Sequence, residues 1–280
     1  MKNLFLCSFA SPDLNISVKR FINQSKDIGM YKNIKVFGWQ DLKFEKKQQI
    51  NSFLEKNNKR LFGYACWKPD IILDYLNNIP EGSILQYSDI GCHFNKNGIT
   101  RLKEYVEIVS EKNILPFQYK KPEFKNDLDL KFQIYLEHHY TKADLFDHFN
   151  LSNDSPIKNS EQIWSGTIFF KNNVNTKNFV KDWVRICNIN NLIDDSPSIL
   201  MNNEGFIEHR HDQSVFSILC KLNNFSCLSA SECEWAENEK GRYWDHLTNY
   251  PILAKRDKKL NIFKRFFSRQ LKNIKRLIKK

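Results

Sequence analysis

The chain has 280 residues, 41% of them hydrophobic and 14% aromatic, which is enough to bury the core of one large domain or two small ones. No stretch approaches the roughly 18 consecutive apolar residues that a membrane-spanning helix needs. The net charge of +11 lies entirely in residues 255–280, which contain twelve Lys or Arg and one acid, whereas residues 1–254 contain 31 basic and 31 acidic side chains. A neutral body argues against nucleic-acid binding, because a domain that binds nucleic acid carries a basic face of its own. Seven cysteines without a C-x-x-C pair favour reduced thiols, a cytoplasmic protein and no zinc cage.

The first elements along the chain alternate between strand and helix. Apolar residues predict a buried strand at Leu4–Phe9 and a second strand at 33–38. Each strand is followed by an amphipathic pattern, one running through 16–22 and the other over 45–57. This order predicts a parallel sheet with helices packed on it.

The segment 60–70 is dense in aromatic residues and contains two cations, Arg60 and Lys68. Pro69 opens the following helix, at the position where its missing N–H costs least. The two cations are candidate contacts for a phosphate group. The same residues also fit two solvated charges beside a core Trp67, and the segment alone favours that simpler interpretation.

The stretch 82–92 predicts a turn, a buried strand and an acidic residue at the end of the strand. Ile84, Leu85 and Tyr87 favour a covered strand. Asp89 then lies where the strand opens into a loop, which is the edge of an open α/β sheet where ligands bind. A carboxylate there suits a hard divalent cation that shares a diphosphate. On these residues alone, an Asp that caps the next turn is the more common arrangement.

The middle of the chain combines predicted helices with one strong strand. Helices are expected over 100–112, 128–136 and 178–188, and a strand is expected over 161–171. Gly166 lies within that strand and permits the close approach of a ligand or of another backbone.

Asp212 and Gln213 form a second informative pair, directly before an apolar helix predicted over 215–222. The first turn of a helix favours a carboxylate through the helix dipole. The pair therefore fits either a sugar site or a simple N-terminal cap. His209 and His211 could be interpreted as metal ligands, but they have no third ligand nearby in the sequence.

The end of the chain contains an aromatic loop and a basic tail. The loop 241–251 shows neither strand nor helix period, and His246 is its only imidazole. Loops of this kind often line sites, although a lone His is more often a hydrogen-bonded surface residue. In 258–280, apolar residues recur every three or four positions among Lys and Arg, which predicts a basic amphipathic helix on an anionic membrane surface. A nucleic-acid arm and a helix docked on the body are the alternatives, and the aromatic residues on the apolar stripe favour the membrane.

Taken in order, these segments resemble a nucleotide-sugar-dependent glycosyltransferase of the GT-A fold, of the bacterial kind that builds lipopolysaccharide or capsule. The resemblance rests on the first buried strand, the Trp-Lys-Pro segment at 67–69, the strand that ends in Asp89, the strand containing Gly166, the Asp-Gln helix start and the late His246. It implies an α/β fold with a mixed, mostly parallel sheet flanked by helices and a Rossmann-like nucleotide-binding half. It further implies one domain over 1–254, with a nucleotide-sugar half at 1–95 and an acceptor half at 96–254, followed by the tail at 255–280.

The resemblance also implies roles for individual residues and a reaction. It places Phe9 and Ala10 at the base, and Arg60 and Lys68 near the diphosphate or the sugar. Tyr87, Ser88 and Asp89 would bind the nucleotide sugar, with Asp89 at the diphosphate, and Asp89 and His246 would hold Mn²⁺ or Mg²⁺. Trp164, Ser165, Gly166 and His211 would lie at the sugars, and Asp212 and Gln213 at the reacting carbon. The implied enzyme is a hexosyltransferase that uses a nucleoside diphosphate sugar, with a UDP-sugar favoured. It would glycosylate a lipid-linked or other surface glycan, with retention, at the inner face of the cytoplasmic membrane.

One departure from the family pattern keeps other interpretations open. The family's metal motif is Asp-x-Asp, but here the second acid is Gly91. A metal-independent enzyme is therefore an alternative, and in an inverting enzyme Asp212 would be the base that activates the acceptor hydroxyl. A different class of function also remains, a non-catalytic membrane-surface interaction protein on a transferase-like fold.

Overall fold

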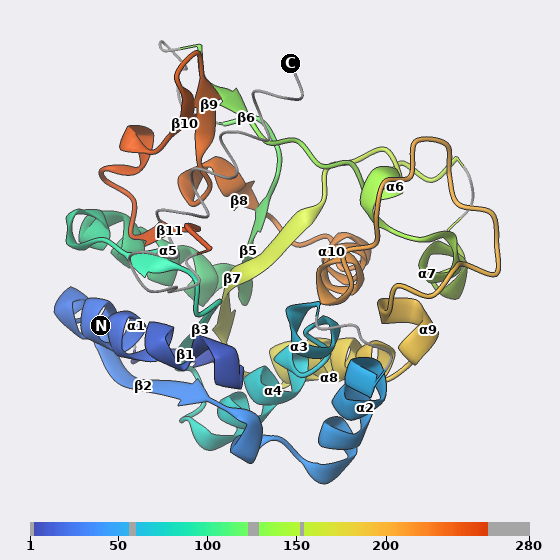
Figure 1. Cartoon of the computed structure of the whole chain (residues 1–280). Helices are drawn as coiled ribbons and strands as arrows, with labels where there is room; N and C mark the ends of the chain where they lie inside the picture. The colour runs from blue at the N-terminus through green and yellow to red at the C-terminus, as the bar shows by residue number, and fades with distance from the viewer. Residues whose placement is uncertain (1–2, 56–59, 123–128, 152–153, 257–280) are drawn as a thin grey trace.

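A computed structural model describes residues 3–55, 60–122, 129–151 and 154–256 of the protein (Figure 1). The strands are β1 (Leu4–Phe9), β2 (Tyr31–Phe37), β3 (Ile84–Ser88), β4 (His93–Phe94), β5 (Ile114–Gln118), β6 (Lys131–Phe132), β7 (Ile163–Lys171), β8 (Leu228–Ser229), β9 (Ala236–Asn238), β10 (Gly241–Tyr243) and β11 (Ile252–Leu253). The helices are α1 (Asn15–Ile28), α2 (Phe44–Glu55), α3 (Leu61–Tyr64), α4 (Lys68–Asn78), α5 (Ile99–Lys112), α6 (Glu137–Tyr140), α7 (Ala143–His148), α8 (Val174–Cys187), α9 (Asn190–Ile193) and α10 (Asp212–Leu222).

A six-stranded sheet in the order β2-β1-β3-β7-β5-β8 forms the centre of the molecule. β1 pairs in parallel with β2 and β3, and β5 pairs in parallel with β8. β7 runs antiparallel to both of its neighbours, β3 and β5, so it is the reversed strand in an otherwise parallel sheet. The prediction of a mixed, mostly parallel α/β sheet is confirmed.

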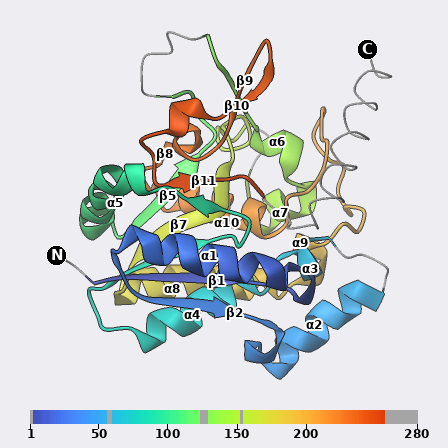
Figure 2. The same cartoon turned by 60° about the vertical axis from the view of Figure 1, so that its left-hand side comes forward.

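Helices cover both faces of this sheet, which explains why its central strands are continuous apolar runs. Alternate residues of β1 enter the two halves of the core: Leu4 and Leu6 pack with α1 and α5, whereas Phe5, Cys7 and Phe9 pack with α4, α8 and α10. Figures 1 and 2 show α1 and α5 on one side of the sheet and α4 and α8 on the other. The second face is the one that carries the candidate site.

Two short sheets lie beside the central one, in the order β10-β9-β6 and β11-β4. The helix predicted over 128–136 is wrong, because Lys131–Phe132 is a strand that pairs antiparallel with β9. The apolar residues there recur at every second position, which is a strand period rather than a helix period. The loop 241–251 likewise includes strand β10 and a short 3-10 helix at Asp245–Leu247, which the sequence did not predict.

The predicted tail helix at 258–280 lies outside the described residues. Within the part of the chain that the structure describes, no helix combines the length and the apolar character needed to cross a lipid bilayer.

Candidate functional site

The carboxyl ends of β1 and β3 meet at one edge of the sheet, and hydrogen bonds fix the loop that follows β3. The backbone N–H of Asp89 donates to the carbonyl of Gly166 on β7 at 2.8 Å, and the N–H of Cys92 closes a turn on the carbonyl of Asp89 at 2.8 Å. From α1, the buried Arg20 guanidinium donates to the carbonyls of Ile90 at 2.5 Å and Cys92 at 2.6 Å. Asp89 therefore occupies a defined position at the edge where ligands bind in open α/β sheets.

The Asp89 side chain lies at the mouth of the site and is 46% exposed. Its Oδ1 accepts a hydrogen bond from the Tyr87 hydroxyl at 2.7 Å and lies 3.6 Å from Lys68 Nζ. Tyr87 is fully buried, and burial followed by the Asp89 charge holds its pKa well above the usual range. The phenol therefore stays protonated and serves as a fixed hydrogen-bond donor to the carboxylate.

Behind Asp89 lies a buried ion pair between Lys68, the first residue of α4, and Asp212, the first residue of α10. Lys68 Nζ is 2.6 Å from Asp212 Oδ2, and the two side chains are 4% and 3% exposed. The Ser165 hydroxyl of β7 donates to the same Oδ2 at 2.9 Å and lies 3.0 Å from Lys68 Nζ. The predicted residues Lys68, Asp89, Ser165 and Asp212 thus form one cluster, called the inner cluster below.

Burial and charge oppose each other at the inner cluster. Burial lowers the pKa of the Lys68 ammonium, but the charges of Asp212 and Asp89 outweigh it and raise that pKa above its ordinary value. Burial also raises the pKa of Asp212, while the Lys68 ammonium acts in the opposite direction. Lys68 is therefore charged at neutral pH, and its ammonium limits the rise that burial causes in the pKa of Asp212.

A bulge in β7 brings Ser165 and Gly166 to this cluster. Leu115 of β5 pairs with Phe169, but Phe117, two residues later, already pairs with Trp164, so β7 carries extra residues between these points. Bulges of this kind are frequent next to active sites, where they redirect side chains. The glycine is required there, because a Cβ at Gly166 would lie 2.2 Å from the ring of the buried Trp164.

The amide of Gln213 has a defined orientation. Its Nε2 donates to Gln162 Oε1 at 2.7 Å, and its Oε1 lies 3.5 Å from the backbone N–H of Ser165. Gln162 is itself oriented by the fully buried Glu137, whose Oε2 accepts from Gln162 Nε2 at 3.3 Å. The sequence did not indicate a role for Gln162 or Glu137, because no local motif links residues so far apart in the chain.

The segment between α2 and α4 has unusual backbone angles. Four non-glycine residues within 61–65 have a positive φ, between 48° and 58°. Such angles cost free energy and persist where packing enforces them, which occurs most often near functional sites. Here the segment positions Trp67, whose ring stacks on Phe9 with centroids 3.9 Å apart and whose indole N–H donates to the Phe62 carbonyl at 3.1 Å.

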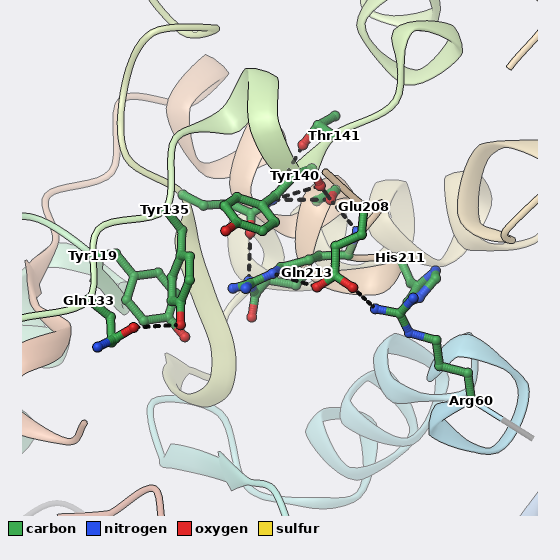
Figure 3. A network of polar contacts seen from close by, with 12 residues as sticks. Arg60, Tyr119, Gln133, Tyr135, Tyr140, Thr141, Glu208, His211 and Gln213 are labelled. Atoms are coloured by element: carbon green, nitrogen blue, oxygen red, sulfur yellow. Dashed lines mark hydrogen bonds and ion pairs between the residues drawn. The ribbon is translucent and has the colours of Figure 1, made fainter. Parts of the chain in front are cut away.

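Arg60 belongs to a second group of charges, which lies closer to solvent. Its guanidinium lies 2.7 Å from Glu208 Oε2 and 3.5 Å from Asp195 Oδ1, and Glu208 Oε1 lies 3.6 Å from Arg210 Nε. Arg60, Asp195, Glu208 and Arg210 are called the outer cluster below. Figure 3 shows Glu208 reaching Arg60 on one side, with Tyr135 and Tyr140 on the other. Arg60 pairs with two acids of this cluster, and its predicted contact with the diphosphate or the sugar stays a prediction.

His211 connects the two clusters and is completely buried. Its ring packs 4.6 Å from that of Tyr64, its Nδ1 lies 2.7 Å from the Ile193 carbonyl, and its Nε2 lies 3.7 Å from Asp195 Oδ1. Its backbone has φ 55° and ψ −124°. Burial is the main cause that lowers its pKa to about 4. The imidazole is therefore neutral at physiological pH, and the Ile193 carbonyl selects the tautomer with the proton on Nδ1.

The remaining predicted residues lie around the inner cluster or away from it. Phe9 and Ala10 are buried at the end of β1, and the Ser88 hydroxyl hydrogen-bonds Gln86 and Thr167 within the sheet. His246 lies by the small sheet, where its Nε2 is 3.0 Å from the Glu234 carbonyl. The predicted contacts of these residues with base, diphosphate and metal stay predictions.

A divalent cation fits this site only with ligands from a substrate. Within residues 3–55, 60–122, 129–151 and 154–256, no group of three His, Cys, Asp or Glu side chains is arranged to hold a metal ion. Asp89 is half-exposed, however, and the contacts with Tyr87 and Lys68 involve only its Oδ1. Mg²⁺ is commonly held by one or two carboxylates together with substrate phosphates and waters, and Asp89 meets that requirement.

Comparisons with known proteins give distant likenesses in structure only. No protein-family profile and no curated protein matches the chain. Among solved structures, it is similar to a glycosyltransferase involved in the glycosylation of the major capsid of PBCV-1, with a TM-score of 0.47 and 10% identity over 90% of this chain and 91% of that chain. It is also similar to mouse xyloside xylosyltransferase 1 in its apo form, with a TM-score of 0.40 and 10% identity over 83% of this chain and 87% of that chain.

Proposed function

We propose that this protein is a glycosyltransferase that moves a sugar from a nucleoside diphosphate sugar to a glycan acceptor. The observation that carries the proposal is the Lys68 ammonium, held between the buried Asp212 and the half-exposed Asp89 at the edge where β1 and β3 end. A buried ion pair is often no more stabilising than apolar packing. Titratable groups that are perturbed by burial and by specific partners are concentrated at functional sites. This arrangement therefore supports chemistry at the sheet edge.

The charge balance of the inner cluster supports a cation-dependent donor. Asp89 and Asp212 carry two negative charges against the single positive charge of Lys68. An anionic diphosphate would be repelled by this excess unless a cation accompanied it. Asp89 would hold that cation, which when bound would stabilise the charge on the departing diphosphate. Lys68 lies between Asp89 and Asp212 and offsets part of their negative charge.

The arrangement at α10 supports a retaining reaction. Asp212 is 2% exposed, and its contacts with Lys68 and Ser165 both involve Oδ2. A general base has to come within hydrogen-bond distance of the acceptor hydroxyl, which this buried carboxylate does less readily than a surface one. Gln213 is only partly buried, and its oriented amide is the group that would meet a sugar at the reacting carbon.

Thermal unfolding with UDP, GDP and CMP, each with and without Mn²⁺, tests the proposal. A nucleotide present at 100 times its dissociation constant adds about 2.7 kcal/mol to the free energy of unfolding. We expect stabilisation by one nucleoside diphosphate, UDP being favoured, and expect it to need Mn²⁺. Stabilisation without Mn²⁺ would support the transferase and contradict the proposed cation at Asp89. No stabilisation by any nucleotide would shift the proposal to a non-catalytic interaction protein.

Two substitutions separate the roles of the acids. Asp89→Asn should abolish the Mn²⁺-dependent part of UDP binding. Asp212→Asn should leave UDP binding nearly unchanged and lower turnover at least 100-fold, because the buried carboxylate fixes Lys68 and Ser165 beside Gln213. Asp74→Asn is the matched control, because Asp74 is a half-exposed acid near the other end of α4. Full turnover in both site variants would contradict the assignment.

We also propose that the acceptor is presented at a membrane surface, through the basic aromatic sequence of 258–280. Each cation near an anionic bilayer contributes roughly 1 kcal/mol of attraction. The whole protein should therefore sediment with vesicles that contain anionic lipid, less so as salt is raised, and not with neutral vesicles. Equal binding to DNA at the same salt would favour a nucleic-acid arm instead.

A further inference from the structure

Arg210, two residues before Asp212, lies in a corner formed by two tyrosine rings. Its Cζ is 3.8 Å from the ring centroid of Tyr135 and 4.1 Å from that of Tyr140, and the two rings stand at 89° to each other. The backbone N–H of Arg210 donates to the Tyr140 carbonyl at 3.1 Å. The guanidinium is therefore held in place by both rings and by the backbone, at little further cost in conformational entropy when it binds.

The contacts of Arg210 leave most of its donors unused. Its Nε lies 3.6 Å from Glu208 Oε1, but the other oxygen of that carboxylate lies 2.7 Å from Arg60. Among the described residues, no hydrogen bond is made by the two Nη groups of Arg210. Its side chain is 19% exposed, so these groups can reach a ligand. The Nη groups form a planar fork whose geometry matches the oxygens of a phosphate or a carboxylate.

Arg210 is joined to the inner cluster through Gln213. Gln213 contacts Ser165 of the inner cluster through its Oε1, and its backbone N–H donates to the Arg210 carbonyl at 3.0 Å. Figure 3 shows Gln213 beside Glu208, with Tyr135 and Tyr119 beyond it. The Arg210 side chain itself contacts Glu208 of the outer cluster, so a group bound by Arg210 would lie beside that cluster, whereas the proposed diphosphate lies at Asp89 of the inner cluster.

We propose that Arg210, fixed by Tyr135 and Tyr140, binds an anionic oxygen group, a phosphate or a carboxylate, that a substrate of the transfer carries. This inference rests on the proposed function, whose acceptor it describes further. The position of the fork favours a charged acceptor, such as a sugar phosphate or a uronic acid, over the diphosphate of the donor.

The test measures binding of four probes to the whole protein by calorimetry: UDP with Mn²⁺, glucuronate, glucose 6-phosphate and neutral glucose. Arg210→Lys keeps the charge and the alkyl chain but loses the planar fork, and Arg210→Ala loses both. Arg185→Lys is the control, because Arg185 is an exposed arginine on α8 that pairs with Asp182 of its own helix. Circular dichroism and urea unfolding confirm that each variant is folded.

The wild-type protein should bind the two anionic sugars more tightly than glucose. Arg210→Lys should weaken that binding about 10- to 100-fold, the worth of a charge-assisted hydrogen bond, while UDP affinity stays within twofold. A loss of UDP affinity alone would assign the same fork to the donor diphosphate. The inference is overturned if neither Arg210 variant changes any affinity, or if the wild-type protein binds neither anionic sugar better than glucose and both variants keep its UDP affinity.

The same experiment separates this inference from the proposed function. Titration of the anionic sugars without nucleotide does not require a transferase. Failure of every nucleotide to bind, with Arg210-dependent binding of glucuronate retained, would reject the transferase and keep the anion site. Normal UDP binding without any effect of the Arg210 variants would support the transferase and reject the anion site.

Discussion

The inner and outer clusters contain ion pairs of nearly equal length in very different surroundings. Lys68 and Asp212 approach to 2.6 Å with side chains 4% and 3% exposed, whereas Arg60 and Glu208 approach to 2.7 Å with side chains 36% and 39% exposed. Distance alone would rank them as equals. Burial makes the inner pair hard to break, because each charge left behind is without water, and leaves the outer pair easy to exchange for solvent or for a ligand.

Lys68→Met should show the largest effect. The substitution leaves Asp212 as an uncompensated buried charge and should lower the free energy of unfolding at pH 7 by about 3–5 kcal/mol. The pKa of Asp212 is already raised by burial, and loss of the ammonium raises it further. The folded variant then gains stability as the carboxyl becomes protonated. The difference in free energy of unfolding between the wild-type protein and Lys68→Met should therefore shrink from pH 7 to pH 5.

Urea unfolding of the wild-type protein, Lys68→Met and Lys68→Met/Asp212→Asn measures this effect. The double variant has no charge at these two buried positions and should recover much of the loss. A loss below 1 kcal/mol in the single variant would show that the inner pair behaves like the outer one, and the comparison between the clusters would fail.

His211 lies between the clusters, and its response to pH reports on how dry the site is. Its pKa of about 4 in the folded state is below the value near 6.5 that it has in the unfolded chain. Between these pH values the unfolded chain binds a proton at His211 that the folded protein does not bind. The contribution of His211 to the free energy of unfolding is therefore complete above pH 6.5 and is lost as pH falls toward 4. For this one group, the free energy of unfolding changes by up to about 1.4 kcal/mol per pH unit.

The free energy of unfolding should therefore fall less steeply between pH 6.5 and 4.5 in His211→Gln than in the wild-type protein. The variant should also be less stable at pH 7, because it loses the packing on Tyr64. His138→Gln is the control, since His138 is a partly exposed histidine outside both clusters. Equal slopes in the wild-type protein and His211→Gln would mean that water reaches the imidazole.

The two clusters also differ in how far the sequence predicted them. Lys68, Asp89 and Asp212 each follow a local pattern that the sequence shows, namely a proline-opened helix, the end of an apolar strand and the start of an apolar helix. Each pattern alone favoured a simpler structural role, and the order of the segments along the chain indicated a shared site; the sheet brings these ends together. The same reasoning predicted the buried strands and the long amphipathic helices.

The outer cluster depends on segments that no period describes. Asp195, Glu208 and Arg210 lie in irregular chain between α9 and α10. Tyr135 lies where a helix was wrongly expected, and Tyr140 ends the short helix α6, which the sequence did not predict. Arg60 was predicted as a phosphate contact, and only the fold shows that it faces two acids. Loop geometry and pairing between distant residues determine the contacts of the outer cluster, and no local sequence pattern predicts either of them.

Arg60→Gln should show the smallest effect on stability. An exposed ion pair contributes about 0–1 kcal/mol, and salt screens it. A double-mutant cycle of Arg60→Gln and Glu208→Gln should therefore give a coupling free energy below about 1 kcal/mol at low salt, falling further at high salt. A coupling above 2 kcal/mol would show that the outer cluster is drier than its exposure indicates.

Glu208→Gln also removes the acid next to Arg210, so it should strengthen the binding of an anionic sugar, whereas Arg60→Gln should leave that binding nearly unchanged. Because both variants alter the same ion pair, a difference between them in anion binding cannot come from the loss of that pair, and it would identify Glu208 as the group that weakens the Arg210 site in the free protein.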